Sequence, residues 1–304
     1  MEGQANTGWF LPFASRATAT MISPVTARRV PGSGDKSPIF IPGKGPGVLC
    51  LHGFTGTPYE VAPLARALGD AGFAVSAPML AGHGATTAAL AATRWRDWLA
   101  SAEAALHQLR STSNGGPVAI AGFSMGGLLA LRLARLQPGA VSALVLMSVP
   151  LRLPDWQVAV LRVFRRLPAF LRESRLAAIH KRAGSDVTDP RVRDENPALV
   201  EMPLARIAEL VDLGETVRRD LPSIQAPALV AHGERDHTVP QSASFELAGS
   251  LASETVERLW LPLSSHLIAV DVEHARLGEA VLRFLRAHGS GSSPPATCDD
   301  GPTA

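Results

Sequence analysis

Short, continuous apolar runs alternate along this chain with longer stretches in which apolar residues recur at helical spacing. The runs read GVLCLHG, FAVSAP, PVAIAGF, VSALVLMS, APALVAHG and VERLWLP. Apolar runs without polar alternation are typical of strands that are covered on both faces. Since Gly or Pro bounds most of them, the sequence predicts a set of short, buried strands.

Between these runs, apolar side chains repeat every three or four residues, which predicts amphipathic helices. Such stretches extend from Val61 to Leu68, from Trp95 to Leu109 and from Met125 to Leu136, and a last helix is predicted to begin near Glu273. Strands and helices that take turns predict an α/β fold, with a mostly parallel central sheet and helices on both faces. In such sheets, reactive groups gather at the carboxyl ends of the strands.

The chain has 304 residues, of which 46% are hydrophobic, enough for one domain of catalytic size. The alternation of strands and helices occupies residues 37–150 and 221–288, and it is interrupted over 151–220. We expect residues 1–36 to be an unstructured extension, because Ser, Thr, Ala, Gly and Pro dominate them. The biased composition of residues 289–304 predicts a disordered tail.

Charge and cysteine content exclude several functions. With 29 Lys and Arg against 27 Asp and Glu, the chain lacks the basic excess that nucleic-acid binding requires. Cys50 and Cys298 have neither metal-ligand spacing nor the pattern of a disulfide framework, so no metal or other cofactor is predicted. The N-terminal segment reads poorly as a secretory signal, and no apolar run reaches the roughly 18 residues of a membrane span. These features predict a cytoplasmic protein.

The stretch AGFSMGGLLALRLA places Ser124 where a strand-like run meets a helix-like one. Gly122 and Gly126 let the strand and the helix approach at a sharp angle, as in the G-x-S-x-G nucleophile elbow. A hydroxyl there is exposed to substrate, and the amide of Met125 can donate to a developing oxyanion. The alternative is a serine that only caps a helix in a glycine-rich turn.

A nucleophilic serine needs a base and an acid, which in this arrangement follow in the order Ser, Asp or Glu, His. Asp236 comes just after the run APALVAHG, and His266 comes just after VERLWLP. Both belong at the same sheet edge as Ser124. We expect His266 to take the serine proton, and Asp236 to orient the imidazole and stabilise its protonated form.

Four other residues compete for these roles: Glu234 and Asp271 as the acid, and His237 and His274 as the base. Glu234 lies nearer its strand, and His274 falls in the predicted last helix. Both positions favour a structural or surface role.

A second oxyanion donor is expected in the loop after the first predicted strand, which reads LHGFTGTP. The amide of Phe54 points into the site if the backbone turns at Gly53 and Gly56, which glycine permits. We assign His52 a structural role in this loop, and we expect His83 to organise the loop after the next strand, although a base could also lie at that position.

Taken in order and spacing, LHGFTGTP, APMLAGHG, GFSMGG, GERDHTVP and SSHLIAVD resemble the α/β-hydrolase superfamily, and in particular its bacterial carboxylesterase and monoacylglycerol lipase branch. The likeness covers about residues 46–287. It implies a nucleophile, an acid, a base and two oxyanion donors at Ser124, Asp236, His266, Phe54 and Met125.

The resemblance also implies that residues 151–220 form a helical cap over the site. Within them, an apolar stripe is predicted to face the body of the protein, with arginines on the opposite face. The stripe comprises Trp156, Ala159, Val160, Val163, Phe164 and Leu167, and the arginines are Arg162, Arg165 and Arg166. Weak contact of this basic helix with a membrane surface is the alternative.

A complete set of Ser, Asp and His predicts a serine hydrolase that cleaves carboxylic esters through an acyl-enzyme. An apolar cap favours short- to medium-chain acyl esters or monoacylglycerols, so the expected partner is a small, lipid-like ester. Thioesterases, C–C hydrolases and acyltransferases use the same triad and remain alternatives. A binding protein that keeps the fold without turnover is another, because fold alone does not confer function.

Overall fold

The computed structural model describes residues 34–290, except for residues 114, 153–158, 160, 162, 165, 169–177 and 181–183. Its central sheet has seven strands in the order β1-β3-β2-β4-β5-β8-β9. The strands are β1 (Ile39–Ile41), β2 (Gly47–Leu51), β3 (Ala74–Ala77), β4 (Val118–Phe123), β5 (Val141–Met147), β8 (Ala228–Gly233) and β9 (Val256–Leu261). Strand β1 pairs antiparallel with β3, and the other pairs in this sheet are parallel. The predicted mostly parallel α/β fold is therefore confirmed, and each of the six apolar runs contains one of these strands.

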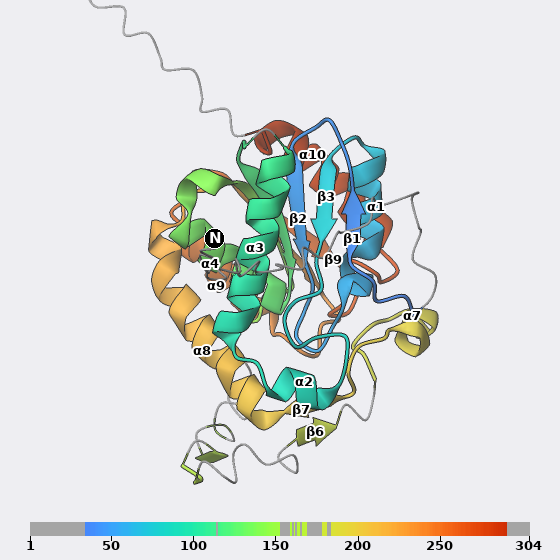
Figure 1. The fold of residues 1–304 in the computed structure, drawn as a ribbon, viewed down its shortest axis with the longest axis vertical. Coiled ribbons are helices and arrows are strands. Elements are labelled where there is room, and N and C mark those ends of the chain that lie inside the picture. The colour runs from blue at the N-terminus through green and yellow to red at the C-terminus, as the bar shows by residue number, and fades with distance from the viewer. Residues whose placement is uncertain are drawn as a thin grey trace, which may run out of the picture. The chain divides into compact units, whose positions relative to one another are not determined.

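Helices cover both faces of this sheet. They are α1 (Ala62–Asp70), α3 (Trp95–Thr112), α4 (Met125–Leu136), α8 (Leu204–Asp220), α9 (Gln241–Ser250) and α10 (His274–His288). Neighbouring residues of a strand point to opposite faces: in β4, Ile120 lies in the hydrophobic cluster shared with α3, α4, α8 and α9, whereas Ala121 lies in the cluster shared with α1 and α10. Figure 1 shows α3 and α8 on one side of the strands and α1 on the other.

One strand departs from the expectation that both faces are covered. Strands β2, β4, β5 and β8 are buried along their whole length, whereas most residues of β9 are only partly buried. Strand β9 is the last strand of the sheet, so its outer edge has no neighbour within the sheet. The run VERLWLP therefore predicted the strand correctly but overestimated its burial.

Between β5 and β8 the chain forms α7 (Pro190–Glu195), α8 and a separate two-stranded antiparallel sheet of β6 (Ala178–His180) and β7 (Glu201–Pro203). Another short helix, α2 (Thr87–Ala91), lies between β3 and α3. Leu213 and Val217 of α8 lie in the same hydrophobic cluster as α4, so α8 also forms part of the layer over the sheet. The boundaries of the predicted insertion at 151–220 stay a prediction.

The apolar stripe predicted to pack inward from residues 156–167 is wrong in part. Val163 is 65% exposed and Leu167 is 41% exposed, whereas Leu161 and Phe164 are buried. The buried pair is three residues apart, so the inward face passes through Leu161, which the stripe omitted. The other predicted members of this region that lie outside the described residues are Trp156, Val160, Arg162 and Arg165.

The predicted extension at residues 1–36 and the predicted tail at 289–304 lie almost wholly outside the described residues. In the described part of the chain, no helix combines the length and the hydropathy that a bilayer crossing requires. Cys50 is a buried free thiol, and burial raises its pKa to about 12. Across the described ranges, no cluster of three or more His, Cys, Asp and Glu side chains is arranged to hold a metal ion.

Candidate active site

Ser124 lies on a tight turn between β4 and α4. Its backbone has a φ of 51°, a left-handed conformation that non-glycine residues seldom adopt. The turn depends on small neighbours, because a Cβ atom added to Gly122 would lie 2.4 Å from the Gly126 carbonyl oxygen, and one added to Gly126 would lie 2.3 Å from the Leu51 carbonyl oxygen. The Ser124 amide donates to the Met147 carbonyl of β5 at 2.8 Å. The glycines thus let strand and helix touch, and the turn presents the hydroxyl at the carboxyl end of the sheet.

Two hydrogen bonds connect this hydroxyl to an imidazole and a carboxylate. Nε2 of His266 lies 3.1 Å from Oγ of Ser124, and Nδ1 of His266 lies 2.8 Å from Oδ2 of Asp236. Asp236 follows β8 and His266 follows β9, so the groups come from strands that are close neighbours in the sheet. The structure therefore brings together all three residues that the sequence singled out.

The carboxylate of Asp236 is held from several sides. Its Oδ1 accepts hydrogen bonds from the amides of Thr238 and Val239, both at 2.8 Å, and Nε2 of His232 lies 3.5 Å from its Oδ2. Burial alone would raise the pKa of Asp236. The charge and hydrogen bond of His266, the Val239 amide and His232 together outweigh burial and lower that pKa. Asp236 is therefore ionised at neutral pH.

His266 is buried, and burial by itself would lower its pKa. The charge and hydrogen bond of Asp236, with the more distant carboxylates of Asp186 and Glu60, reverse this effect and raise the pKa above its ordinary value. An imidazole with this hydrogen bond at Nδ1 carries its proton there when neutral, which leaves Nε2 free to accept a proton from the serine.

The competing residues have other partners. Glu234 is exposed, and the side chain of His237 is 81% exposed with its ring 3.3 Å from Asp186. His274 is the first residue of α10, and its ring donates to the Asp271 carbonyl at 2.8 Å. The buried carboxylate of Asp271 accepts backbone amides, including that of Ser265 at 2.7 Å. Asp271 thus braces the loop that carries His266.

The loop after β2 places the two predicted oxyanion donors near one another. Leu51 pairs with Gly122 across β2 and β4, so Phe54 and Met125 each follow their strand by a few residues. Met125 begins α4, where an amide has no acceptor within the helix. That these two amides form an oxyanion hole stays a prediction.

A buried carboxylate shapes this loop from the inside. Oε2 of Glu60 accepts the Gly53 amide at 3.0 Å, and a Cβ atom on Gly56 would lie 1.9 Å from the same oxygen. A side chain at position 56 would therefore displace the Glu60 carboxylate from this position. The Gly53 amide is engaged by this carboxylate, and Phe54 is the next residue along the turn.

His52 and His83 support the same loop without touching the serine. Nδ1 of His52 donates to the Gly53 carbonyl at 2.9 Å, and Nε2 accepts the Leu80 amide at 3.1 Å. Burial lowers the pKa of His52 to about 3 and that of His83 to about 4, so both rings are neutral. The ring of His83 lies against those of His52 and Phe54, with centroids 5.1 and 6.1 Å apart, and its Nδ1 donates to the Ala81 carbonyl at 2.9 Å. These contacts agree with the structural roles expected for both histidines.

Sequence reasoning missed three residues near the triad: Glu60, Asp186 and His232. Glu60 reads as an ordinary acidic residue at a helix start, and Asp186 lies in the interrupted region, where no periodic pattern marks it. His232 belongs to an apolar run, and its buried ring is bonded to Ser244 at 2.8 Å. That Asp236 lies between the rings of His232 and His266 is visible only in the folded chain.

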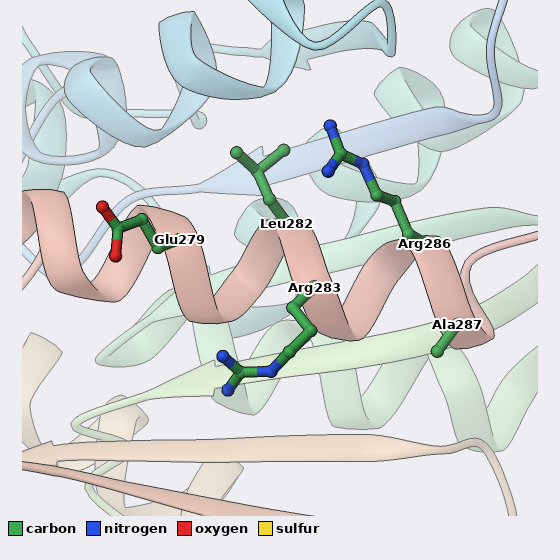
Figure 2. A pocket seen from close by; sticks show the side chains of 5 residues that line it. All are labelled: Glu279, Leu282, Arg283, Arg286 and Ala287. Atoms are coloured by element: carbon green, nitrogen blue, oxygen red, sulfur yellow. The ribbon is translucent and has the colours of Figure 1, made fainter.

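A surface hollow lies along α10 and has no triad residue in its lining. Figure 2 shows that one helix supplies the residues that line it, which are Glu279, Leu282, Arg283, Arg286 and Ala287. A substrate site usually draws convergent polar groups from several elements. We therefore place no part of the chemistry there.

Comparison with known proteins gives a consistent picture. The family model for serine aminopeptidase S33 matches residues 46–273. A thermostable monoacylglycerol lipase of Bacillus sp. (strain H-257) is 31% identical over 80% of this chain and 91% of its own length. A carboxylesterase of Bacillus subtilis (strain 168) is 26% identical over 82% of this chain and 95% of its own. A solved structure from work on LipS and LipT, two metagenome-derived lipolytic enzymes, is 30% identical with a TM-score of 0.75, over 83% of this chain and 98% of that one.

Proposed function

Because this chain belongs to the serine aminopeptidase S33 family of α/β hydrolases, we propose that it is a serine hydrolase that cleaves uncharged carboxylic esters through an acyl-enzyme intermediate. The observation that carries the proposal is the unbroken series of hydrogen bonds from the Ser124 hydroxyl through His266 to Asp236. The names of the relatives, monoacylglycerol lipase and carboxylesterase, agree with ester chemistry.

In the first half of the reaction, Oγ of Ser124 attacks the ester carbonyl carbon while Nε2 of His266 takes the hydroxyl proton. The carbonyl oxygen becomes an oxyanion, which accepts hydrogen bonds from the amides of Phe54 and Met125. Collapse of this intermediate breaks the bond to the alcohol oxygen. The alcohol leaves with the proton from His266, and the acyl group stays on Ser124.

In the second half, His266 removes a proton from water, and the hydroxide formed attacks the acyl carbon. A second oxyanion forms and collapses, Oγ of Ser124 leaves with the proton, and the carboxylic acid is released. Asp236 keeps its negative charge throughout and stabilises the imidazolium that forms in each half. No cofactor takes part.

The charges around His266 support an uncharged substrate. The carboxylates of Asp236, Asp186 and Glu60 all favour the positive form of His266, so the potential around the base is negative. An ester that carries an anionic group next to its carbonyl would be repelled. The predicted apolar stripe at residues 156–167 does not support this substrate class, since Val163 and Leu167 are exposed.

The proposal is tested with p-nitrophenyl esters of increasing chain length, monoacylglycerols and acyl-CoA, given to wild type and to Ser124→Ala. We expect the butyrate to octanoate esters and monoacylglycerols of similar length to be cleaved best. Ser124→Ala is expected to lower kcat by roughly 10⁴-fold or more. A fluorophosphonate should label wild type at Ser124, and labelling elsewhere contradicts the proposed nucleophile.

Two outcomes of the same panel decide against the uncharged ester. A preference of about tenfold or more for acyl-CoA would make the protein a thioesterase, because that ratio corresponds to about 1.4 kcal/mol in transition-state binding. Binding of esters without turnover would make it a binding protein. A cytoplasmic location and weak contact of residues 151–220 with a membrane surface stay predictions from the sequence.

A further inference from the structure

Two loops carry the acid and the base, and a third segment connects them. Residues 234–240 follow β8 and contain Asp236, and residues 262–273 follow β9 and contain His266. Residues 184–189, which we call the clasp segment, come from the chain between β6 and α7. The clasp segment makes hydrogen bonds to both loops.

Asp186 of the clasp segment binds the acid-bearing loop with its side chain. Its Oδ2 accepts the His237 amide at 2.9 Å and the Thr238 hydroxyl at 2.8 Å. The ring of His237 lies 3.3 Å from the other carboxylate oxygen. These partners are the two residues that directly follow Asp236.

The same residue binds the base-bearing loop with its backbone. The Asp186 carbonyl accepts the amide of Leu267, the neighbour of His266, at 3.1 Å. Two residues later, Thr188 binds Ser265 through their hydroxyls at 2.9 Å, and its amide donates to Asp271 at 3.0 Å. The clasp segment is thus bonded to residues on both sides of His266.

We propose that Asp186 is a positioning residue for the Asp236 and His266 pair: its side chain and carbonyl hold the two loops in register, and its charge adds to the field on the base. The inference rests on the proposed function, since it concerns how efficiently the same triad works. A residue that bridges the two loops controls the orientation of Asp236 and His266, and small displacements of catalytic groups lower the rate strongly.

The charge can be separated from the geometry because the groups around His266 are known. Asp236 contacts its Nδ1, while the carboxylates of Asp186 and Glu60 and the imidazole of His232 act on it from further away. The side chains of Asp236 and Glu60 are buried, whereas that of Asp186 is 20% exposed. Asp186 can therefore be substituted with less disturbance of the core. Replacement of this one carboxylate by an amide removes one negative charge and keeps those of Asp236 and Glu60.

Asp186→Asn is the decisive variant. We expect kcat/KM with a p-nitrophenyl ester to fall roughly 5- to 50-fold, and the acidic limb of its pH profile to move down by roughly 0.3 to 1 pH unit, because His266 loses a stabilising charge. His237→Gln is measured in parallel, alone and combined with Asp186→Asn, so that titration of His237 is removed from the profile. Glu234→Gln, which removes an exposed carboxylate from the same loop, is the matched control and should leave both quantities at the wild-type values.

Asp186→Glu and Thr238→Val separate the two contributions. Each keeps the negative charge and disturbs the contacts to the acid-bearing loop, so kcat should fall severalfold while the acidic limb stays in place. If Asp186→Asn does not fold, these two variants still test the bridge, and wild-type kcat in both overturns it.

Two results for a folded Asp186→Asn contradict the inference: unchanged kcat/KM, or a lower kcat/KM with an unmoved acidic limb, which would make Asp186 merely structural. Labelling of Ser124 by a fluorophosphonate in wild type distinguishes this failure from failure of the proposed function. If the inference about Asp186 fails, wild type is still labelled and still turns over esters. If wild type shows neither labelling nor turnover, the proposed function itself is contradicted.

Discussion

His52 and His266 are both buried, at 0% and 6% exposure, and both use their two ring nitrogens, yet they have opposite chemistry. His52 bonds a backbone carbonyl and a backbone amide, and its pKa is lowered to about 3 by burial. His266 bonds a carboxylate and a hydroxyl, and its pKa is raised. Burial alone therefore does not tell a structural histidine from a base; the partner of Nδ1 does.

The loop after β2 shows that a nearby carboxylate is not sufficient either. Glu60 lies inside this loop, but its Oε2 accepts the Gly53 amide. The Nδ1 of His52 is already bonded to the Gly53 carbonyl. Both ring nitrogens of His52 are bonded to backbone groups, so in this loop the backbone and burial decide the state of the ring.

The sharpest test of the contrast is His266→Ala. We expect kcat to fall by roughly 10⁴- to 10⁶-fold, close to the loss from Ser124→Ala, because the residues of a triad act as a unit. Steady-state turnover of a p-nitrophenyl ester and the rate of fluorophosphonate labelling measure the effect. His274→Ala is the control and should cost less than about tenfold; activity in His266→Ala with loss in His274→Ala would reassign the base.

Asp236→Asn should be the next largest effect. An asparagine no longer stabilises the imidazolium and can hold the wrong tautomer, so kcat should fall by about 10³- to 10⁴-fold, less than for His266→Ala. The pH profile gives a second measurement: His266 must be neutral to act, so wild-type activity falls as the pH drops through its raised pKa. Without Asp236 that limb should move to lower pH, and an unmoved limb would contradict the assigned partner.

His52→Ala should affect stability more than chemistry. It leaves the buried Leu80 amide without its acceptor, which should lower the free energy of unfolding by about 1 to 3 kcal/mol. Denaturant unfolding measures this, and His52→Gln, which offers an acceptor near the former Nε2, is the matched control. A loss of turnover as large as that of His266→Ala, in a folded variant, would contradict a structural role.

The same variant changes how stability depends on pH. The pKa of His52 is lowered from 6.5 to about 3, so below pH 6.5 the unfolded state binds the proton that the folded state refuses. Wild type should therefore lose stability as the pH falls from 6.5 towards 3. His52→Ala should show a shallower loss, because His83, whose pKa is lowered to about 4, and His232 and Asp236, whose pKa values are also lowered, still contribute.

The sequence was most informative for features that depend only on residues close together in the chain. Continuous apolar runs predicted six strands, and the glycines around Ser124 predicted a turn that only small residues allow. Strand β1 and the two-stranded sheet of β6 and β7 were missed, because each strand has three residues and is too short for a hydrophobic pattern.

The supports of the site could not be predicted for a different reason. Asp186 is meaningful only through partners far along the chain, since it meets His237 across 51 positions. Glu60 bonds Gly53 in its own loop, and its effect on His266 depends on how that loop is placed in the fold. The predicted helical stripe in residues 156–167 was only partly right: Phe164 is buried as expected, but Leu161, which the stripe omitted, is also buried, and Val163 and Leu167 are exposed. Local patterns specify elements, whereas these contacts depend on how the elements meet.

The contact between β4 and α4 has a consequence for the evolution of new specificities. A Cβ atom at Gly122, Gly126 or Gly127 would come within 2.4 Å of a neighbouring atom, so the turn under the nucleophile offers almost no neutral variation. Most variants in a mutagenesis library at these positions are therefore expected to be inactive. Exposed positions such as Val163 and Val200, between β5 and α8, are under no such steric limit. Diversity in substrate choice should therefore accumulate there, while the turn that generates the nucleophile is inherited unchanged.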